Sequence, residues 1–133
     1  MKRFVLDSYS VMAYAEGEQG ADFVEDLFVK ALDDRAMLMM SVVNWGEMYY
    51  IALRQGGEER AELYRTTLQK YPIEIIDADQ NTTIEAAHFK AFHKISYADA
   101  FAAALAKTRK AQLVTGDPEF KTLEKLVSLF WIR

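Results

Sequence analysis

Short, mostly apolar runs alternate with longer amphipathic stretches along the chain. The apolar runs predict strands at 4–6, 37–40, 73–76, 113–114 and 127–132. Between them, apolar residues recur every three to four positions, which predicts helices over 21–32, 42–54, 58–70, 82–92 and 97–109. Dense alternation of strands and helices is typical of a parallel sheet covered on both faces. The pattern therefore predicts an α/β fold, a three-layer α/β/α sandwich with a mainly parallel sheet of about five strands.

Capping and stop signals mark the ends of several of these segments. Ser41 is a candidate N-cap for the helix that begins at 42, and Gly56-Gly57 is expected to end that helix. Asp7 followed by Ser8 is typical of a helix start, and so is Asp117 followed by Pro118. We therefore expect a short helix after the first strand and another turn of helix after the fourth.

The composition is that of one globular domain. The chain has 133 residues, of which 51% are hydrophobic and 27% charged, so a single domain over 1–133 with a sizeable core is expected. No apolar run approaches the roughly 18 residues that span a bilayer. The start of the chain lacks the pattern of a secretory signal, so we expect a cytoplasmic protein without membrane contact. The absence of cysteine excludes thiolate metal sites, and two histidines are too few for a three-histidine zinc centre.

The charge balance argues at first against nucleic acid as a partner. Sixteen basic residues stand against twenty acidic ones, which gives a formal net charge of −4. Proteins that bind nucleic acid by neutralising its phosphates are usually basic, or carry a clear basic stripe. Composition alone therefore disfavours nucleic acid.

Four carboxylates change that interpretation. Asp7 and Asp117 directly follow the first and fourth predicted strands, while Glu47 and Asp99 are the only charged residues in 42–53 and 97–106. In parallel α/β sheets, ligands bind at the carboxyl ends of the strands. Each acid has another explanation by itself, because the three aspartates can cap helices and Glu47 can form an ion pair.

Taken together, the four acids point to a metal site. Carboxylates without a histidine or cysteine partner are hard oxygen ligands, which favour Mg²⁺ or Mn²⁺ over zinc. Such ions are the usual machinery of phosphodiester hydrolysis. The excess of four acidic residues also equals the number of proposed ligands, so the acidity is consistent with a metal site.

Four segments carry a resemblance to a known family. Residues 4–8 (Phe-Val-Leu-Asp-Ser), 41–47 (Ser-Val-Val-Asn-Trp-Gly-Glu), 95–100 (Ile-Ser-Tyr-Ala-Asp-Ala) and 113–120 (Leu-Val-Thr-Gly-Asp-Pro-Glu-Phe) resemble the four successive motifs of a PIN domain. The resemblance is strongest to the VapC toxins of prokaryotic toxin–antitoxin pairs. The motifs run in family order and cover essentially the whole chain, which implies a PIN-like fold.

The resemblance implies a metal-dependent endoribonuclease. The acids Asp7, Glu47, Asp99 and Asp117 match the family residues that bind Mg²⁺ or Mn²⁺ and activate water for hydrolysis of RNA. Thr115 matches a polar residue that supports the site by hydrogen bonding, and Ser8 matches the small polar residue after the first acid. The family also implies a homodimer and a cognate antitoxin protein that blocks the active site.

Candidate contacts with RNA are few. Lys121 lies one helical turn after Asp117 and is a candidate for the RNA backbone, and His93 and Lys94 are candidates for a phosphate. The basic cluster over 107–110 precedes the fourth strand, so it is expected at the opposite end of the sheet from the acids.

Other functions remain open at this point. The chain can also be a housekeeping PIN-domain RNA-processing nuclease, or a catalytically silent α/β interaction module whose acids are all caps. A phosphotransfer enzyme with Asp7 as nucleophile is disfavoured, because Tyr9 occupies the position where a dehalogenase-like site needs a second aspartate. The sequence leaves open which RNA is cut, the number of ions and the identity of the antitoxin.

Overall fold

Five parallel strands form one sheet in the computed structural model, which describes all 133 residues. The strand order is β3-β2-β1-β4-β5. The strands are β1 (Lys2–Leu6), β2 (Ala36–Ser41), β3 (Ile73–Ile76), β4 (Gln112–Thr115) and β5 (Leu129–Trp131). The predicted α/β class is confirmed, and the sheet is parallel throughout. The third strand matches its predicted range, and the fifth is shorter than the predicted 127–132.

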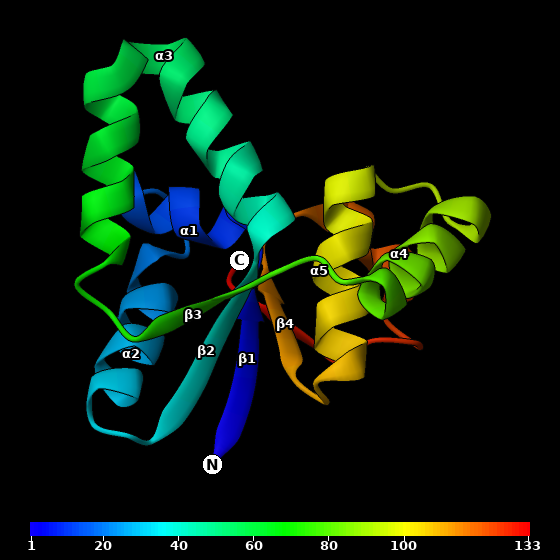
Figure 1. Cartoon of the computed structure of the whole chain (residues 1–133). Coiled ribbons are helices and arrows are strands. Elements are labelled where there is room, and N and C mark those ends of the chain that lie inside the picture. The colour runs from blue at the N-terminus through cyan, green and yellow to red at the C-terminus, as the bar shows by residue number, and fades with distance from the viewer.

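Helices cover both faces of this sheet (Figure 1). They are α1 (Ser8–Ala15), α2 (Ala21–Leu32), α3 (Val42–Leu68), α4 (Gln80–Phe92), α5 (Tyr97–Thr108) and the short 3-10 helix η1 (Pro118–Leu123). Helices α1, α2 and α3 pack on one face, and α4 and α5 pack on the other. Each face of the sheet therefore has its own hydrophobic core. Side chains alternate along β2, so Leu38 and Met40 enter the core under α1, α2 and α3, while Met39 enters the core under α4 and α5. No helix combines the length and the apolar character that crossing a membrane requires.

Helix α3 consists of two arms joined at a sharp kink. The sequence predicted two helices separated by Gly56-Gly57, and both glycines have non-helical backbone angles, with φ 72° at Gly57. The second arm follows the first without a loop, and Figure 1 shows the two arms projecting together beyond the carboxyl ends of the strands. Because the second arm folds back, Tyr64 and Leu68 reach the same core as Met48 of the first arm.

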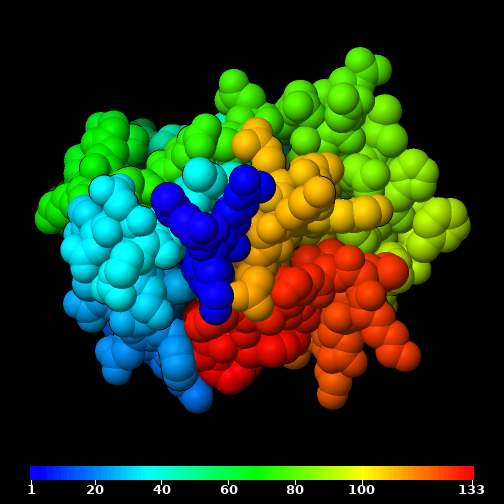
Figure 2. All heavy atoms as spheres, turned by 90° about the horizontal axis from the view of Figure 1, so that it is seen from below, coloured from blue at the N-terminus to red at the C-terminus, as the bar shows by residue number.

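Helix α5 packs closely on the middle of the sheet because its buried face is made of small residues. Residues 100–106 are all buried, and five of these seven are alanine. The amino end of α5 lies near the carboxyl ends of the strands (Figure 1). Figure 2 looks onto the opposite, amino ends, where β1 lies between β2 and β4. The basic segment 107–110 lies toward these amino ends, and Arg3 Nη1 donates to the carbonyl of Arg109 at 3.2 Å.

Gly20, the N-cap of α2, packs against Ile132, which directly follows the last strand, and its substitution tests this packing. Gly20 has φ 98°, and an added Cβ would lie 2.8 Å from the Ile132 carbonyl oxygen. We expect Gly20→Ala to lower the free energy of unfolding by at least about 1–2 kcal/mol, the cost of the left-handed conformation. Gly46→Ala is the matched control, because Gly46 is helical and has no atom within 4 Å of an added Cβ. Urea unfolding of the two variants measures the difference, and equal stabilities would contradict this account.

Candidate functional site

Asp7 lies at the carboxyl end of β1 and is completely buried. It is the N-cap of α1: its Oδ1 accepts from the backbone N–H of Ser10 at 2.8 Å, and its Oδ2 accepts from the Thr115 hydroxyl at 2.5 Å. Burial raises the pKa of Asp7 to about 6, although these hydrogen bonds to Thr115 and Ser10 oppose the rise. Removal from water therefore has a larger effect than the donors around this carboxylate.

Thr115 connects the two acids that follow the central strands. It is the last residue of β4, which pairs directly with β1, and it is fully buried. Its hydroxyl donates to Asp7 and accepts from the backbone N–H of Asp117 at 3.0 Å. Asp117 in turn is the N-cap of η1, where its Oδ1 accepts from the backbone N–H of Glu119 at 3.0 Å. One hydroxyl thus sets the relative positions of the two strand ends.

Asp99 comes from the opposite side of the sheet, in the first turn of α5. Ser96 is the N-cap of this helix, and its hydroxyl accepts from the backbone N–H of Asp99 at 3.1 Å. The pKa of Asp99 is raised to about 7, first by burial and then by the negative charges of Asp117, Asp7 and Glu47. The structure therefore brings the four predicted acids close enough to repel one another.

Glu47 reaches the same place from the first arm of α3. Its Oε1 accepts a hydrogen bond from the hydroxyl of Ser8, the residue directly after Asp7. This contact connects the start of α1 to α3. Ser8 therefore orients the one acid of the four that lies in the middle of a helical arm.

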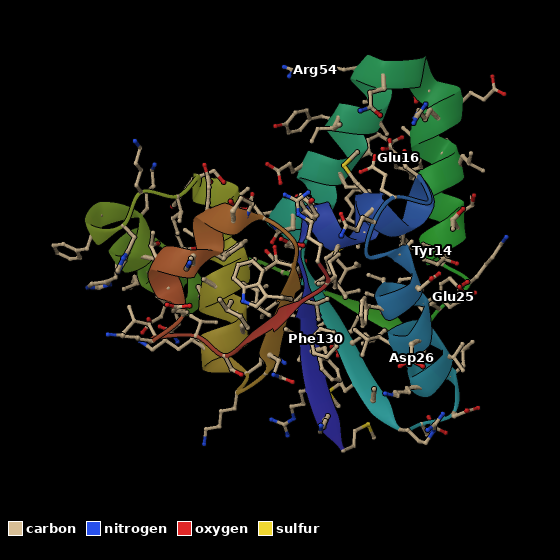
Figure 3. The ribbon with its side chains drawn as sticks, turned by 180° about the vertical axis from the view of Figure 1, so that it is seen from behind. Tyr14, Glu16, Glu25, Asp26, Arg54 and Phe130 are labelled. Carbon is tan, nitrogen blue, oxygen red and sulfur yellow. The ribbon has the colours of Figure 1, made fainter.

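A crevice of about 500 Å³ opens beside these acids. Besides Glu47, Asp99 and Asp117, it is lined by Ser8, Tyr9, Met12, Ala13, Glu16, Glu18, Ile51, Gln55, Ser96 and Glu119. Glu16 is already paired, because its Oε1 accepts from Arg60 at 2.9 Å and from the Tyr64 hydroxyl at 2.7 Å. Figure 3 shows Glu16 at the end of α1, beside the arms of α3. This wall of the crevice is held by the second arm of α3.

Glu119 is a member of the acidic cluster that the sequence analysis did not select. Carboxylate oxygens of Asp99, Asp117 and Glu119 all lie within 4.8 Å of one another. The sequence interpretation treated Glu119 only as part of the capping turn after Asp117. The sequence held no signal for this role, because the cap of Asp117 fixes the backbone N–H of Glu119 and leaves the direction of its side chain open.

The proposed RNA-contact residues lie outside the crevice. Lys121 and Lys94 are exposed and do not line it. His93 lines a separate depression, together with Phe92 and Lys107. A further hollow of about 590 Å³ between α3 and β3 is mostly apolar and contains no carboxylate, so it does not fit a cation.

The donor set of the crevice fits a divalent cation. Its lining combines several carboxylates with hydroxyl and amide oxygens and contains no histidine or cysteine, which suits Mg²⁺ or Mn²⁺. A cation beside Asp99 and Asp117 would also remove the repulsion that raises the pKa of Asp99.

Without a divalent ion, the buried acids should make the protein less stable at high pH. The pKa values of Asp7 and Asp99 in the folded protein exceed the reference value of 3.8. Their contribution to stability is therefore fully present below about pH 4 and is lost as the pH rises through 6 and 7. We expect the melting temperature in EDTA to fall between about pH 4 and pH 7, and Asp99→Asn to reduce this fall. The exposed Asp33→Asn should keep the wild-type slope, and an identical slope in Asp99→Asn would contradict the assignment.

Thr115→Val tests the hydroxyl between the two strand ends. Valine keeps the branched shape but leaves Asp7 Oδ2 and the Asp117 N–H without their partner. We expect the free energy of unfolding to fall by about 1–3 kcal/mol, measured by urea denaturation. Thr67→Val is the matched control, because the exposed Thr67 hydroxyl donates only to a carbonyl of its own helix, at 2.7 Å. Equal losses in the two variants would show that Thr115 has no special role.

Comparison with known proteins places this fold and sequence in a family. The profile of the PIN domain matches residues 4–126. No curated protein sequence matches the chain. Among solved structures, DNA-bound VapBC from Salmonella typhimurium is 17% identical, with a TM-score of 0.76 and 100% of both chains covered. VapBC2 from Rickettsia felis, bound to a promoter DNA fragment, is 18% identical, with a TM-score of 0.76, covering 96% of this chain and 97% of that chain.

A third similar structure is described by the RNA that it cleaves. VapC20 from Mycobacterium tuberculosis, a Sarcin-Ricin loop cleaving toxin, is 16% identical with a TM-score of 0.70, covering 90% of this chain and 93% of that chain. At these identities, the structural matches establish a shared fold. The profile, which spans most of the sequence, establishes the family: the chain belongs to the PIN-domain family.

Proposed function

We propose that this PIN domain is a Mg²⁺- or Mn²⁺-dependent endoribonuclease and the toxin of a toxin–antitoxin pair. The observation that carries the proposal is that Glu47, Asp99 and Asp117, from three separate segments, line one crevice, with Asp7 buried close enough for its charge to act on Asp99. Their mutual repulsion, felt most clearly at Asp99, is an energetic cost that a bound cation removes. A fold that needed these acids only as helix caps would not have to bring them together.

In this proposal the acidic residues bind the metal ion. Asp7, Glu47, Asp99 and Asp117 would hold the ion, directly or through water, and Glu119 would add a further carboxylate beside Asp99 and Asp117. Bound there, the ion supplies Lewis acidity, which favours attack of water on phosphorus and stabilises charge on the leaving oxygen.

Two hydroxyls keep the ligands in place. Thr115 holds Asp7 and the backbone of Asp117, and Ser8 holds Glu47. Their role is to fix carboxylates that would otherwise move apart. Hydrolysis of this kind needs no covalent intermediate with the protein.

RNA is proposed as the substrate because the similar Mycobacterium tuberculosis toxin is described as cleaving the Sarcin-Ricin loop. In our proposal Lys121, His93 and Lys94 contact the strand away from the crevice. The chain carries a net negative charge, so RNA binding should be weak unless a cation screens the acidic cluster.

An antitoxin protein and a second copy of the chain are proposed as partners. Similar chains were crystallised in a toxin–antitoxin complex from Klebsiella pneumoniae. A housekeeping RNA-processing nuclease uses the same site and is the second candidate. A silent interaction module accounts for the capping hydrogen bonds of Asp7 and Asp117, but not for the burial of Asp99 against three other carboxylates.

RNA cleavage with Mg²⁺ or Mn²⁺ tests the proposal. Asparagine is also a good N-cap, so Asp7→Asn removes a charge and keeps the cap. We expect Asp7→Asn and Asp99→Asn each to reduce the cleavage rate by more than about 100-fold, since changes outside the ligand shell alone cost 10–100-fold. Exposed Asp33→Asn is the control and should cleave like the wild type.

Two outcomes would reject parts of the proposal. Unchanged cleavage by both active-site variants, or cleavage that persists in EDTA, would exclude the carboxylate–metal mechanism. Expression that leaves cell growth unaffected, with cleavage intact, would favour the housekeeping nuclease over the toxin.

A further inference from the structure

Asn44 is a buried polar residue where α3 meets α5. It lies in the first turn of α3 and is completely buried. Its Nδ2 donates to the carbonyl of Ala98, in the first turn of α5, at 3.1 Å. Its Oδ1 is buried and has no hydrogen-bond partner. A buried acceptor without a partner is costly, so the presence of an amide here needs an explanation.

The stability of the fold does not supply that explanation. The Ala98 carbonyl lies in a helix, where carbonyls accept the hydrogen bonds of residues four positions later, so it does not depend on Asn44. An apolar side chain of similar volume would fill the same space without leaving an oxygen unpaired. The amide is therefore explained only by what its N–H donor holds in place.

The hydrogen bond joins the two helices that carry facing acids. Asn44 lies three residues before Glu47, on the same side of α3, and Ala98 directly precedes Asp99. Glu47 and Asp99 both line the crevice, and as like charges they push their helices apart. Among the hydrogen bonds of the structure, this is the side-chain link between α3 and α5.

We propose that Asn44 is a positioning residue of the metal centre. It holds the first turn of α5 against α3, so that Asp99 and Glu47 remain within reach of one cation. The unpaired Oδ1 is the cost of obtaining an amide N–H donor at this point, since the two groups come together in asparagine. This inference rests on the metal centre of the proposed function, and it does not depend on which nucleic acid is cut.

Mn²⁺ binding to the full chain, without RNA, tests the role of Asn44. Asn44→Leu removes the link and keeps the γ-branched shape, and Asn44→Ala removes it without added bulk. We expect either variant to bind Mn²⁺ about tenfold more weakly in calorimetric titration, as found for changes behind metal ligands. The matched control is Asn81→Leu, because Asn81 is exposed on α4, and it should bind Mn²⁺ like the wild type.

Thermal melting in EDTA distinguishes a positioning role of Asn44 from a role in the stability of the fold. Asn44→Leu should melt no lower than the wild type, because it removes an unpaired oxygen and lets the two acids separate. Wild-type Mn²⁺ affinity in both variants would overturn the proposal. It would also be overturned if the variants bind Mn²⁺ more weakly only to the extent that less of the protein is folded in EDTA.

An activity measurement adds a second readout. The Mn²⁺ concentration for half-maximal RNA cleavage should rise about tenfold in Asn44→Leu, while the KM for RNA at saturating Mn²⁺ stays unchanged. If the wild type binds Mn²⁺ but cleaves no RNA, the proposed function fails and the titration still decides the role of Asn44. If the wild type binds no Mn²⁺, both are overturned.

Discussion

Repulsion among carboxylates at the carboxyl ends of β1 and β4 is the constraint on which the site depends. Asp7 is withdrawn completely from water, and Asp99 faces three other negative charges. Burial of an anion is costly unless donors or a cation surround it. The Thr115 hydroxyl and the backbone N–H of Ser10 donate to Asp7, and Ser96 acts on Asp99, but the pKa values of both aspartates stay raised. The remaining cost is one that a bound cation would remove.

Helix capping and metal binding are compatible in this arrangement because the two oxygens of a carboxylate together offer about four acceptor sites. Asp7 uses Oδ1 for the cap of α1 and Oδ2 for Thr115. Asp117 uses Oδ1 for the cap of η1, and one of its carboxylate oxygens also lies within 4.8 Å of oxygens of Asp99 and Glu119. Capping therefore explains how the acids are held, and the crevice explains why they are gathered. The two interpretations that competed at the level of sequence describe the same side chains.

The distribution of charge along the strands follows from the parallel sheet. Every strand points the same way, so acids that follow strands gather at one end, and the basic residues that precede β4 lie toward the other. The kinked α3 adds a wall to the acidic end, where Glu16 is tied to Arg60 and Tyr64. Six acidic residues therefore line this one crevice: Glu16, Glu18, Glu47, Asp99, Asp117 and Glu119.

Local signals in the sequence determined the elements and the four principal acids. Periodicity and capping act over one or two turns, so they can be recognised without a structure. They predicted the ranges of β3 and α2 and the break at Gly57, and they marked Asp7 and Asp99 as exceptional positions. Strand order, the fold-back of α3 and the meeting of Glu119 with Asp99 were decided only by the tertiary structure. The same holds for the link from Asn44 to α5 and the separate position of His93. These features depend on packing between segments far apart in the chain, which no local pattern encodes.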